Sequence, residues 1–582
     1  MPARFPARLF PLFAHMNAPD RGAFGDDLLA GVITAILLIP QGMAYALLAG
    51  LPPEMGLYAS IVPPFVYAFF GSSRALAVGP VAVAALMVAS ALSAYADGDQ
   101  AKYLTGALIL AAETGLILLA LGVFRLGALV SFISHPVLSG FTTGAAVLII
   151  TSQLKHLTGI DIPRGDGFET VHAIVMRLGE FNAETLTFGV ASVVLLLLAQ
   201  RPLQHLLVQF GLSKRAAGIT SRTAPLVIVC VATAIAATLQ ADTAAGVAIV
   251  GSIPGGLPMP TLEFLTASGW IDLLPSAVLI ALVGYVESVS VAKVLAARRR
   301  QKIDANQELT ALGVTNVAAA VAGTMPVAGG FSRSVVNFDA GARTQLAAII
   351  TAGLVAIVAL FFTAWFHYLP NAVLAAIIVV AVAKLIDVPG ARRVWAYDRA
   401  DGVALVATAL AVLAVGIEAG LLVGIGLSLA LYLWRTSQPH MAVIGRVPGT
   451  EHFRNVCRHV VETDPRLLIV RIDENLYFAN AEAVEAYLME HVEASSRIQH
   501  VLLVLSAVSY IDSSALEVLE HLADDLQAAG ITLHLAEVKG PVMDRLNQSA
   551  LGRVIGPEHI FLTTHRAVEA LAPAPEPTEG IT

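Results

Sequence analysis

Residues 326–333 read PVAGGFSR, and residues 78–82 read VGPVA. Each stretch interrupts an otherwise apolar segment, and the two interrupted segments are seven segments apart along the chain. An odd number of spans in each half makes the second half run inverted relative to the first, as in many secondary transporters. Short Gly- and Pro-interrupted helices at matching positions mark the binding site of such folds. The alternative is that these residues only allow close helix packing.

The composition is that of a membrane protein. Of 582 residues, 57% are hydrophobic and 13% are charged, against about 25% charged in an average soluble domain. Apolar runs long enough to cross about 30 Å of hydrocarbon recur along the chain. We predict an α-helical protein with fourteen spans, near residues 28–49, 56–70, 75–95, 103–123, 127–152, 185–200, 224–239, 272–292, 307–323, 328–340, 345–366, 369–386, 402–417 and 419–434.

Charge divides the chain into a membrane part and an acidic tail. The net charge is −8, and from Thr436 onward about 20 acidic residues accompany about 10 basic ones. We predict four parts: a cytoplasmic N-terminal segment over residues 1–27, a transmembrane transport domain over 28–435, a soluble cytoplasmic domain over 436–572, and a disordered tail over 573–582.

Lysine and arginine gather in alternate loops. The loops assigned to the outside hold only Lys102, Lys155, Arg164 and Arg177, whereas the opposite loops hold many more, including the cluster at residues 298–302. This bias predicts a multi-pass protein of the inner (plasma) membrane with both termini in the cytoplasm. The short apolar start is followed by charged residues, so we expect no cleaved signal peptide.

The two interrupted segments suit an anion. A helix that begins at mid-membrane presents free N–H groups and the positive end of its dipole, here near Gly79, Ala82 and Phe331. Arg333 lies in the first turn of the second such helix, and its planar guanidinium suits a sulfate or a carboxylate. Its alternative role is to brace the structure by pairing with a buried acid or with carbonyls. Ser332 is a weaker candidate, because Ser in a membrane helix commonly bonds its own backbone.

Three further polar residues lie within predicted spans. Gln41 and Tyr45 are one turn apart, and either close the side of a small cavity or bond to neighbouring helices. Glu287 is expected to be partly protonated near neutral pH, because burial disfavours its charged form. It is then able to carry a proton together with the anion. The alternative for Glu287 is an ion pair with Arg333 or Lys293.

Other chemistry has no support in the sequence. There is no Walker A sequence, no HExxH and no pair of CxxC motifs. We therefore expect no enzyme activity, no cofactor, no metal site and no nucleic-acid partner. Glu113 lies near neither interrupted segment, so a role in packing or assembly is expected for it.

Four stretches resemble the SulP (solute carrier 26) family of sulfate permeases and anion exchangers: LIPQGMAYALLAGLPPEMGLYAS at 38–60, SSRALAVGPVAV at 72–83, ESVSVAKVLAARRRQKIDANQEL at 287–309 and GGFSRSVVN at 329–337. The resemblance implies a seven-plus-seven inverted repeat with core and gate domains. It places the anion between the starts of the third and tenth helices, surrounded by Gln41, Tyr45, Val81, Ser332 and Arg333.

The same resemblance bears on the coupling ion. Glu287 matches the acid linked to proton coupling in proton-driven sulfate members of the family. Sodium-coupled bicarbonate members carry an acid further along the eighth span, in a VADG-like motif. This chain reads Val294-Leu295-Ala296-Ala297 there, which argues against sodium coupling.

The acidic tail resembles the STAS domain that follows the membrane part in this family. Residues 466–472, 500–505 and 531–536 have the pattern of strands, and a helix with Leu516, Leu519, Leu522 and Leu526 on one face lies between the last two. Ser513 and Ser514 open that helix where sigma-factor antagonists of this fold are phosphorylated. The alternative is ordinary capping of the helix by Asp512 or Ser513.

The leading hypothesis is a proton-coupled importer of a small oxyanion, most of all sulfate, that works as a homodimer in the lipid bilayer. Transport of bicarbonate or a C4-dicarboxylate, or anion exchange, is the alternative within transport. An uncoupled anion channel or a sensor acting through the STAS domain is the hypothesis from a different class.

Overall fold

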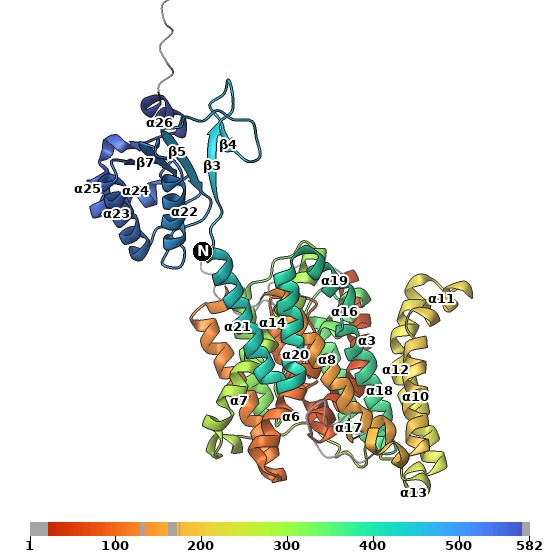
Figure 1. The fold of residues 1–582 in the computed structure, drawn as a ribbon. Coiled ribbons are helices and arrows are strands. Elements are labelled where there is room, and N and C mark those ends of the chain that lie inside the picture. The colour runs from red at the N-terminus through yellow and green to blue at the C-terminus, as the bar shows by residue number, and fades with distance from the viewer. Residues whose placement is uncertain (1–20, 129–133, 161–171, 174, 573–582) are drawn as a thin grey trace, which may run out of the picture. The chain divides into compact units, whose positions relative to one another are not determined.

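The computed structural model describes residues 21–128, 134–160, 172–173 and 175–572. The chain forms two compact units that divide between Ser428 and Leu429. The predicted disordered tail and most of the predicted N-terminal segment lie outside the described residues. The first unit is helical, and the second is an α/β domain (Figure 1).

The helical segments follow the predicted spans in order. Those of the first half are α3 (Arg21–Leu48), α4 (Pro53–Tyr58) with α5 (Val62–Phe70), α6 (Ala82–Ala96), α7 (Gln100–Val123), α8 (His135–Thr158), α10 (Ala183–Leu198) and α12 (Lys214–Leu239). Those of the second half are α14 (Trp270–Arg298), α15 (Ala305–Val321), α16 (Phe331–Ala340), α17 (Leu346–Phe361), α18 (Asn371–Val382), α20 (Arg399–Val415) and α21 (Ile417–Ser437). The connectors include α11 (Arg201–Gln209), α13 (Ala241–Ala245) and α19 (Val388–Tyr397).

The fifth span differs from its prediction, because α8 runs over His135–Thr158 and not over 127–152. Pro136 lies at the start of α8, where its missing N–H costs no hydrogen bond. Among the described residues, seven helices are long and apolar enough to cross a membrane, and a bent pair makes an eighth. Several of the remaining segments are shorter because Gly and Pro interrupt them.

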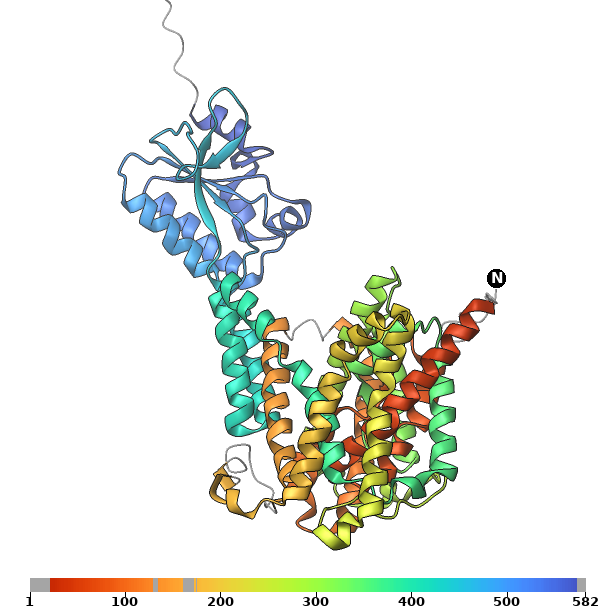
Figure 2. The same ribbon diagram turned by 90° about the vertical axis from the view of Figure 1, so that its right-hand side faces the viewer.

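The two halves meet in the middle of the helical unit. Two short strands, β1 (Val78–Gly79) and β2 (Ala328–Gly329), pair antiparallel, with Val78 opposite Gly329. This pairing satisfies backbone groups of both stretches inside the helical unit, where Val78, Gly79, Ala328 and Gly329 are buried. A Cβ at Gly329 would lie 2.6 Å from Leu76, so the close approach requires glycine. Helices of the two halves also interleave: α3 packs on α16 and α17 (Figure 2).

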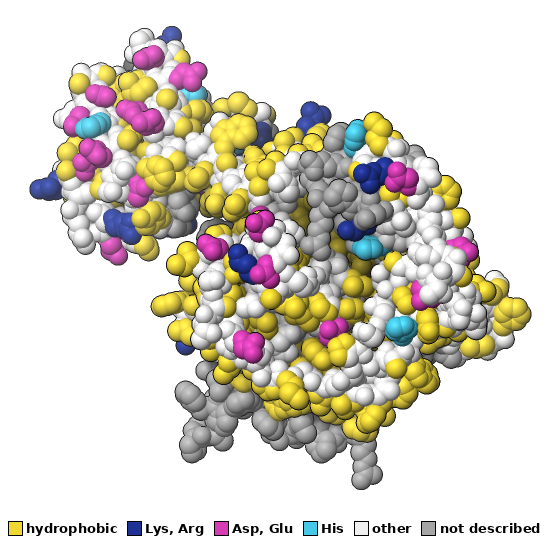
Figure 3. Space-filling model, turned by 90° about the horizontal axis from the view of Figure 1, so that it is seen from below, with side chains coloured by type: hydrophobic (Ala, Val, Ile, Leu, Met, Phe, Trp, Pro, Cys, Tyr) yellow, Lys and Arg dark blue, Asp and Glu magenta, His cyan; other side chains and the backbone are white. Residues whose placement is uncertain are grey.

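Small residues bring α7 and α15 together. A Cβ at Gly115 would lie 2.6 Å from the backbone nitrogen of Val317, and one at Gly313 would lie 2.8 Å from that of Leu119. Close backbone contact of this kind is typical of helix pairs in membranes. Large apolar side chains are exposed on α10, α12, α20 and α21, as expected of a surface that faces lipid. Figure 3 shows hydrophobic side chains along the edge of the helical unit.

The connectors bear on sidedness. The basic connectors α11 and α19 lie at one end of the helical unit, and α13 lies at the opposite end (Figure 1). We therefore keep the predicted orientation, with the end that carries α11 and α19 in the cytoplasm.

A cysteine scan tests this orientation. In a variant whose exposed Cys230 and Cys457 are replaced by serine, Met259→Cys is expected to react with an impermeant thiol reagent in intact cells. Met259 is 85% exposed, in the loop before α14. Arg298→Cys, at the other end of α14, is expected to react only after the cells are permeabilised. Reaction of Arg298→Cys in intact cells would contradict the orientation.

The second unit holds a six-stranded sheet of order β4-β3-β5-β6-β7-β8. Its strands are β3 (Met441–Arg446), β4 (Phe453–Asn455), β5 (Leu467–Ile472), β6 (His500–Val504), β7 (Thr532–Ala536) and β8 (Ile560–Phe561), and its helices are α22 (Ala481–Glu493), α23 (Ser513–Ala528), α24 (Gly540–Leu546), α25 (Ala550–Ile555) and α26 (Thr564–Leu571). The three predicted strands are β5, β6 and β7, and they run parallel.

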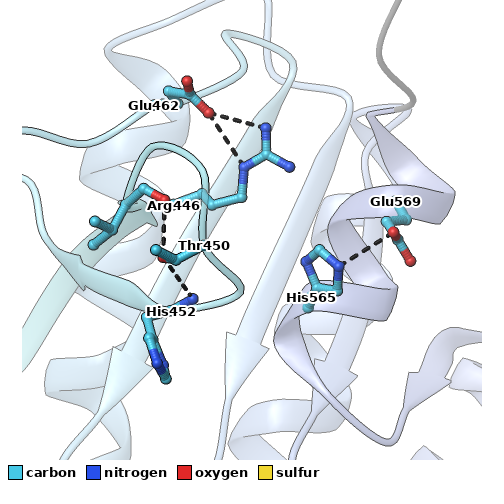
Figure 4. Close-up of polar contacts among 7 residues, drawn as sticks. Arg446, Thr450, His452, Glu462, His565 and Glu569 are labelled. Atoms are coloured by element: carbon cyan, nitrogen blue, oxygen red, sulfur yellow. Dashed lines mark hydrogen bonds and ion pairs between the residues drawn. The ribbon is translucent and has the colours of Figure 1, made fainter.

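The sheet packs on both faces. One apolar core lies against α22, α23, α24 and α25, and a smaller one lies against α26. Exposed ion pairs such as Arg446–Glu462 at 2.9 Å and His565–Glu569 at 3.2 Å lie at the margin of this unit (Figure 4). Such pairs stabilise by at most about 1 kcal/mol each, so the two cores hold the domain together.

Three histidines form a chain on the sheet. His534 Nε2 lies 3.2 Å from His500 Nδ1, and His534 Nδ1 lies 3.2 Å from His559 Nδ1. His534 is 1% exposed. Burial, with His559 and His500 beside it, lowers the pKa of His534 to about 4. Below pH 6.5 the unfolded chain therefore binds a proton at His534 that the folded domain does not bind.

We expect the free energy of unfolding of this α/β domain to fall as the pH drops from about 6.5 to about 4. Over this range the lowered pKa of His534 reduces the free energy of unfolding by about 3 kcal/mol. Above pH 6.5 His534 is neutral in both the folded and the unfolded chain, so it does not make the free energy of unfolding depend on pH. Urea titrations of the domain across this range measure the effect. His534→Gln should flatten the curve, since glutamine does not titrate. Equal pH dependence of both proteins would contradict the assignment.

Candidate functional site

Two helices begin beside β1 and β2 without side-chain caps. α6 starts after Val81, and α16 starts after Gly330; both of these residues are extended and neither helix has a capping side chain. The first N–H groups of a helix have no partner within it. Both helix starts therefore present donors and the positive end of a helix dipole.

These helix starts line one cavity of about 40 Å³. That volume holds roughly three water molecules, the scale of one small oxyanion. The lining residues come from α3, α6, α14, α16 and the end of α18: Gln41, Tyr45, Val81, Ala82, Val83, Glu287, Gly330, Phe331, Ser332, Arg333, Ala381, Val382 and Leu385. All the predicted substrate-binding residues except Gly79 are among them, together with Glu287.

Gly79 lies behind the cavity, in β1, and does not line it. A Cβ there would come within 3.4 Å of Arg333 Nη2. A contact of that length is ordinary, so space alone does not require glycine there; its φ of 156° is one that other residues rarely adopt, and its backbone is paired with Ala328.

Arg333 joins the two helix starts. Its side chain is 2% exposed, and its Nη1 donates to the carbonyl of Pro80 at 2.5 Å, directly before α6. Its Nε and Nη2 are buried and have no hydrogen-bond partner. Leaving a buried charged donor unpaired is costly. One nitrogen thus braces the fold, and two donors remain for a further acceptor.

Gln41 and Tyr45 stand one turn apart on α3, as predicted. Gln41 Nε2 donates to the Tyr45 hydroxyl at 2.8 Å, and both side chains are buried. The hydroxyl accepts in this bond, so its own proton is available to an acceptor in the cavity. The Oε1 of Gln41 is buried without a partner.

Glu287 is half-buried on α14 and lines the cavity. Among the described residues it makes no hydrogen bond and no ion pair with a cation within 4.0 Å. Lys293 is exposed on the same helix. The expected alternative, an ion pair with Arg333 or Lys293, is therefore not formed.

The remaining wall of the cavity could not be predicted from the sequence. Ala381, Val382 and Leu385 close the cavity from α18 and the turn that follows it. They are apolar residues of a mostly apolar span, although Lys384 precedes Leu385, so nothing distinguishes them from residues that face lipid. Glu113 lies on α7 outside the cavity lining, 4% exposed, with its Oε2 unpartnered.

A second cavity of about 200 Å³ lies in the STAS domain, and Ser513 and Arg545 are among its lining residues. Asp512 caps α23 by accepting from the Ala515 nitrogen at 2.8 Å, which matches the capping alternative. Ser513 and Ser514 are exposed. Their modification stays a prediction.

The family models match both units. Residues 24–408 match the sulfate permease family, and residues 458–567 match the STAS domain. This chain belongs to the sulfate permease family. The permease is 38% identical to the probable sulfate transporter 4.2 of Arabidopsis thaliana over 93% of this chain and 80% of the relative. It is 36% identical to a probable sulfate transporter of Mycobacterium tuberculosis over 94% of each chain.

Solved structures share the fold of this permease. The murine Solute Carrier 26 family member A9 anion transporter, in its inward-facing state, has a TM-score of 0.88 and 25% identity over 98% of this chain and 95% of that one. The transmembrane domain of a cyanobacterial bicarbonate transporter has a TM-score of 0.58 and 22% identity over 70% of this chain and 98% of that one. The predicted membrane fold with a seven-plus-seven repeat and a STAS domain is confirmed. The permease is an anion transporter of this family and not an enzyme.

Proposed function

We propose that this permease imports sulfate together with protons and holds the anion between the starts of α6 and α16. The observation that carries the proposal is the pair of buried, unpartnered donors on Arg333, a residue that lines the cavity together with two uncapped helix starts. A guanidinium with two free donors fits a tetrahedral oxyanion. The names of the sequence relatives favour sulfate as that anion.

The proton enters through Glu287. It is the acidic residue of the cavity lining, and among the described residues no cation lies within ion-pair distance of it, although Arg333 lines the same cavity. A dianion arriving beside a charged carboxylate is repelled, so binding favours the protonated acid. Because linkage is reciprocal, protonation also tightens anion binding.

The cavity size bears on the alternatives. A cavity of about 40 Å³ holds a compact inorganic anion, and competition by bicarbonate and succinate decides between the alternatives. We further propose that the permease lies in the inner membrane with both termini in the cytoplasm. The predicted domain limits belong to the same proposal, and the STAS domain helps to join two copies.

Uptake of labelled sulfate into proteoliposomes tests the proposal. An imposed gradient with the outside acidic is expected to drive saturable accumulation above the external concentration, and a protonophore should abolish it. Bicarbonate and succinate serve as competitors. Unsaturable flux would indicate a channel. Saturable sulfate-for-sulfate exchange without gradient-driven accumulation would contradict proton coupling but leave anion transport intact.

A further inference from the structure

Arg299 caps the end of α16 that lies away from the anion cavity. Its Nη2 donates to the carbonyl of Phe338 at 2.9 Å, and its Nη1 donates to the carbonyl of Ala342. Its guanidinium also stacks on the Phe338 ring at 4.0 Å. The last carbonyls of a helix lack partners within it, and a cation at this end opposes the helix dipole. The Phe338 carbonyl also accepts from the Gly341 nitrogen at 3.1 Å, so Arg299 adds a second, charged donor at the C-terminal end of α16.

Arg299 belongs to another helix. It follows directly after α14, which carries Glu287. The same helix also holds the beginning of the α16 segment, where the Ser288 hydroxyl accepts from the Gly329 nitrogen at 2.7 Å. α16 has 10 residues, so α14 fixes this short helix at both of its ends.

Ion pairs and a carboxylate also hold the residues around the C-terminal end of α16. Arg343 pairs with Asp26 at 2.8 Å, and Asp339 on α16 pairs with Arg222 at 3.2 Å. The carboxylate of Asp27 accepts from the nitrogen of Arg343 at 2.6 Å. The bonds of Asp26 and Asp27 hold the turn after α16, and the Asp339 pair holds the helix; Arg299 joins the two, since it donates to Phe338 in the helix and to Ala342 in the turn.

We propose that Arg299 is a positioning residue for anion binding: it fixes α16 against α14 so that Arg333 and the first N–H groups of α16 face the anion. The proposal rests on the anion site proposed above. A rigid helix of 10 residues transmits a shift at its end to its beginning, and donors to an anion lose strength when they are displaced.

The chain supplies matched controls. Arg298 and Arg300 flank Arg299 in sequence, and both are exposed. Each carries the same charge into the same region of the membrane surface. A general effect of positive charge would therefore appear equally in all three positions.

The test measures KM and Vmax for sulfate uptake in proteoliposomes, per amount of monodisperse protein. Arg299→Ala is expected to raise KM about tenfold, with Vmax within about twofold of the parent. The lysine in Arg299→Lys keeps the positive charge but lacks the planar guanidinium that donates to two carbonyls and stacks on Phe338. An intermediate KM is therefore expected. Arg298→Ala and Arg300→Ala should leave KM within about twofold.

Arg333→Ala, measured alongside, separates the two proposals. If it raises KM and Arg299→Ala does not, the positioning role is wrong and the anion site stands. If Arg333→Ala leaves KM unchanged, the guanidinium does not bind the anion, and the positioning role, which acts through Arg333, fails. Should Arg299→Ala not fold, Phe338→Leu removes only the stacking. A KM equal to that of the parent in both Phe338→Leu and Arg299→Lys would overturn the proposal.

Discussion

Replacing Arg333 with alanine is expected to weaken sulfate binding by about 100-fold. The guanidinium is buried, and two of its donors have no partner in the protein. Removing a buried charge that bonds an oppositely charged group costs about 2–5 kcal/mol, which corresponds to at least about 30-fold in affinity. Calorimetric titration of the detergent-purified permease with sulfate measures the change.

The matched control for this variant is Arg298→Ala, because Arg298 is an exposed arginine at the membrane surface. Truncating a charged side chain at the water-exposed surface changes the binding affinity little, because water screens its interaction with the anion. Arg299 is unsuitable as a control, since it caps α16. If sulfate affinity is unchanged in Arg333→Ala, the arginine only braces Pro80 and the helix dipoles bind the anion alone.

Glu287→Gln is expected to abolish accumulation driven by a proton gradient while sulfate still binds. Glutamine has nearly the shape of the protonated acid but cannot release or accept the proton. Binding should therefore become independent of pH over the range in which the parent binds more tightly as the pH falls. Exchange of internal for external sulfate is expected to survive. Uptake of labelled sulfate with and without an imposed gradient measures the change.

Glu113→Gln is the control for this variant. Glu113 is also a buried acid within a membrane helix, but it lies outside the cavity lining. The control should retain accumulation. Gradient-driven accumulation in Glu287→Gln, together with its loss in Glu113→Gln, would move the coupling proton to Glu113. Retention in both variants would exclude both acids.

The sequence predicts those parts of the site whose residues break an otherwise apolar run. Gly and Pro at residues 78–82 and 326–333 break apolar runs, and α6 and α16 begin within these stretches. A single arginine or acid in an apolar span is equally visible, because its burial is costly. Arg333 and Glu287 were therefore predicted, and both line the cavity.

Site residues that resemble their neighbours in the sequence could not be predicted. Leu385 looks like any other apolar residue of its span, although it closes the cavity. Arg299 is one of three consecutive arginines, and the sequence does not tell which of them reaches α16. Only the structure shows that Arg299 bonds to the carbonyl of Phe338. The short strands β3, β4 and β8 were missed as well, since two of them are edge strands whose pairing depends on distant partners.

The central claim is that the anion lies between the starts of α6 and α16. Selenate has the shape and charge of sulfate and contains an anomalous scatterer, so a crystal of the permease soaked in selenate locates the anion directly. We predict an anomalous peak beside Arg333, within hydrogen-bond reach of its Nη2 and of the first N–H groups of α16. A selenate peak elsewhere in the helical unit, in a protein that transports selenate, would contradict the account.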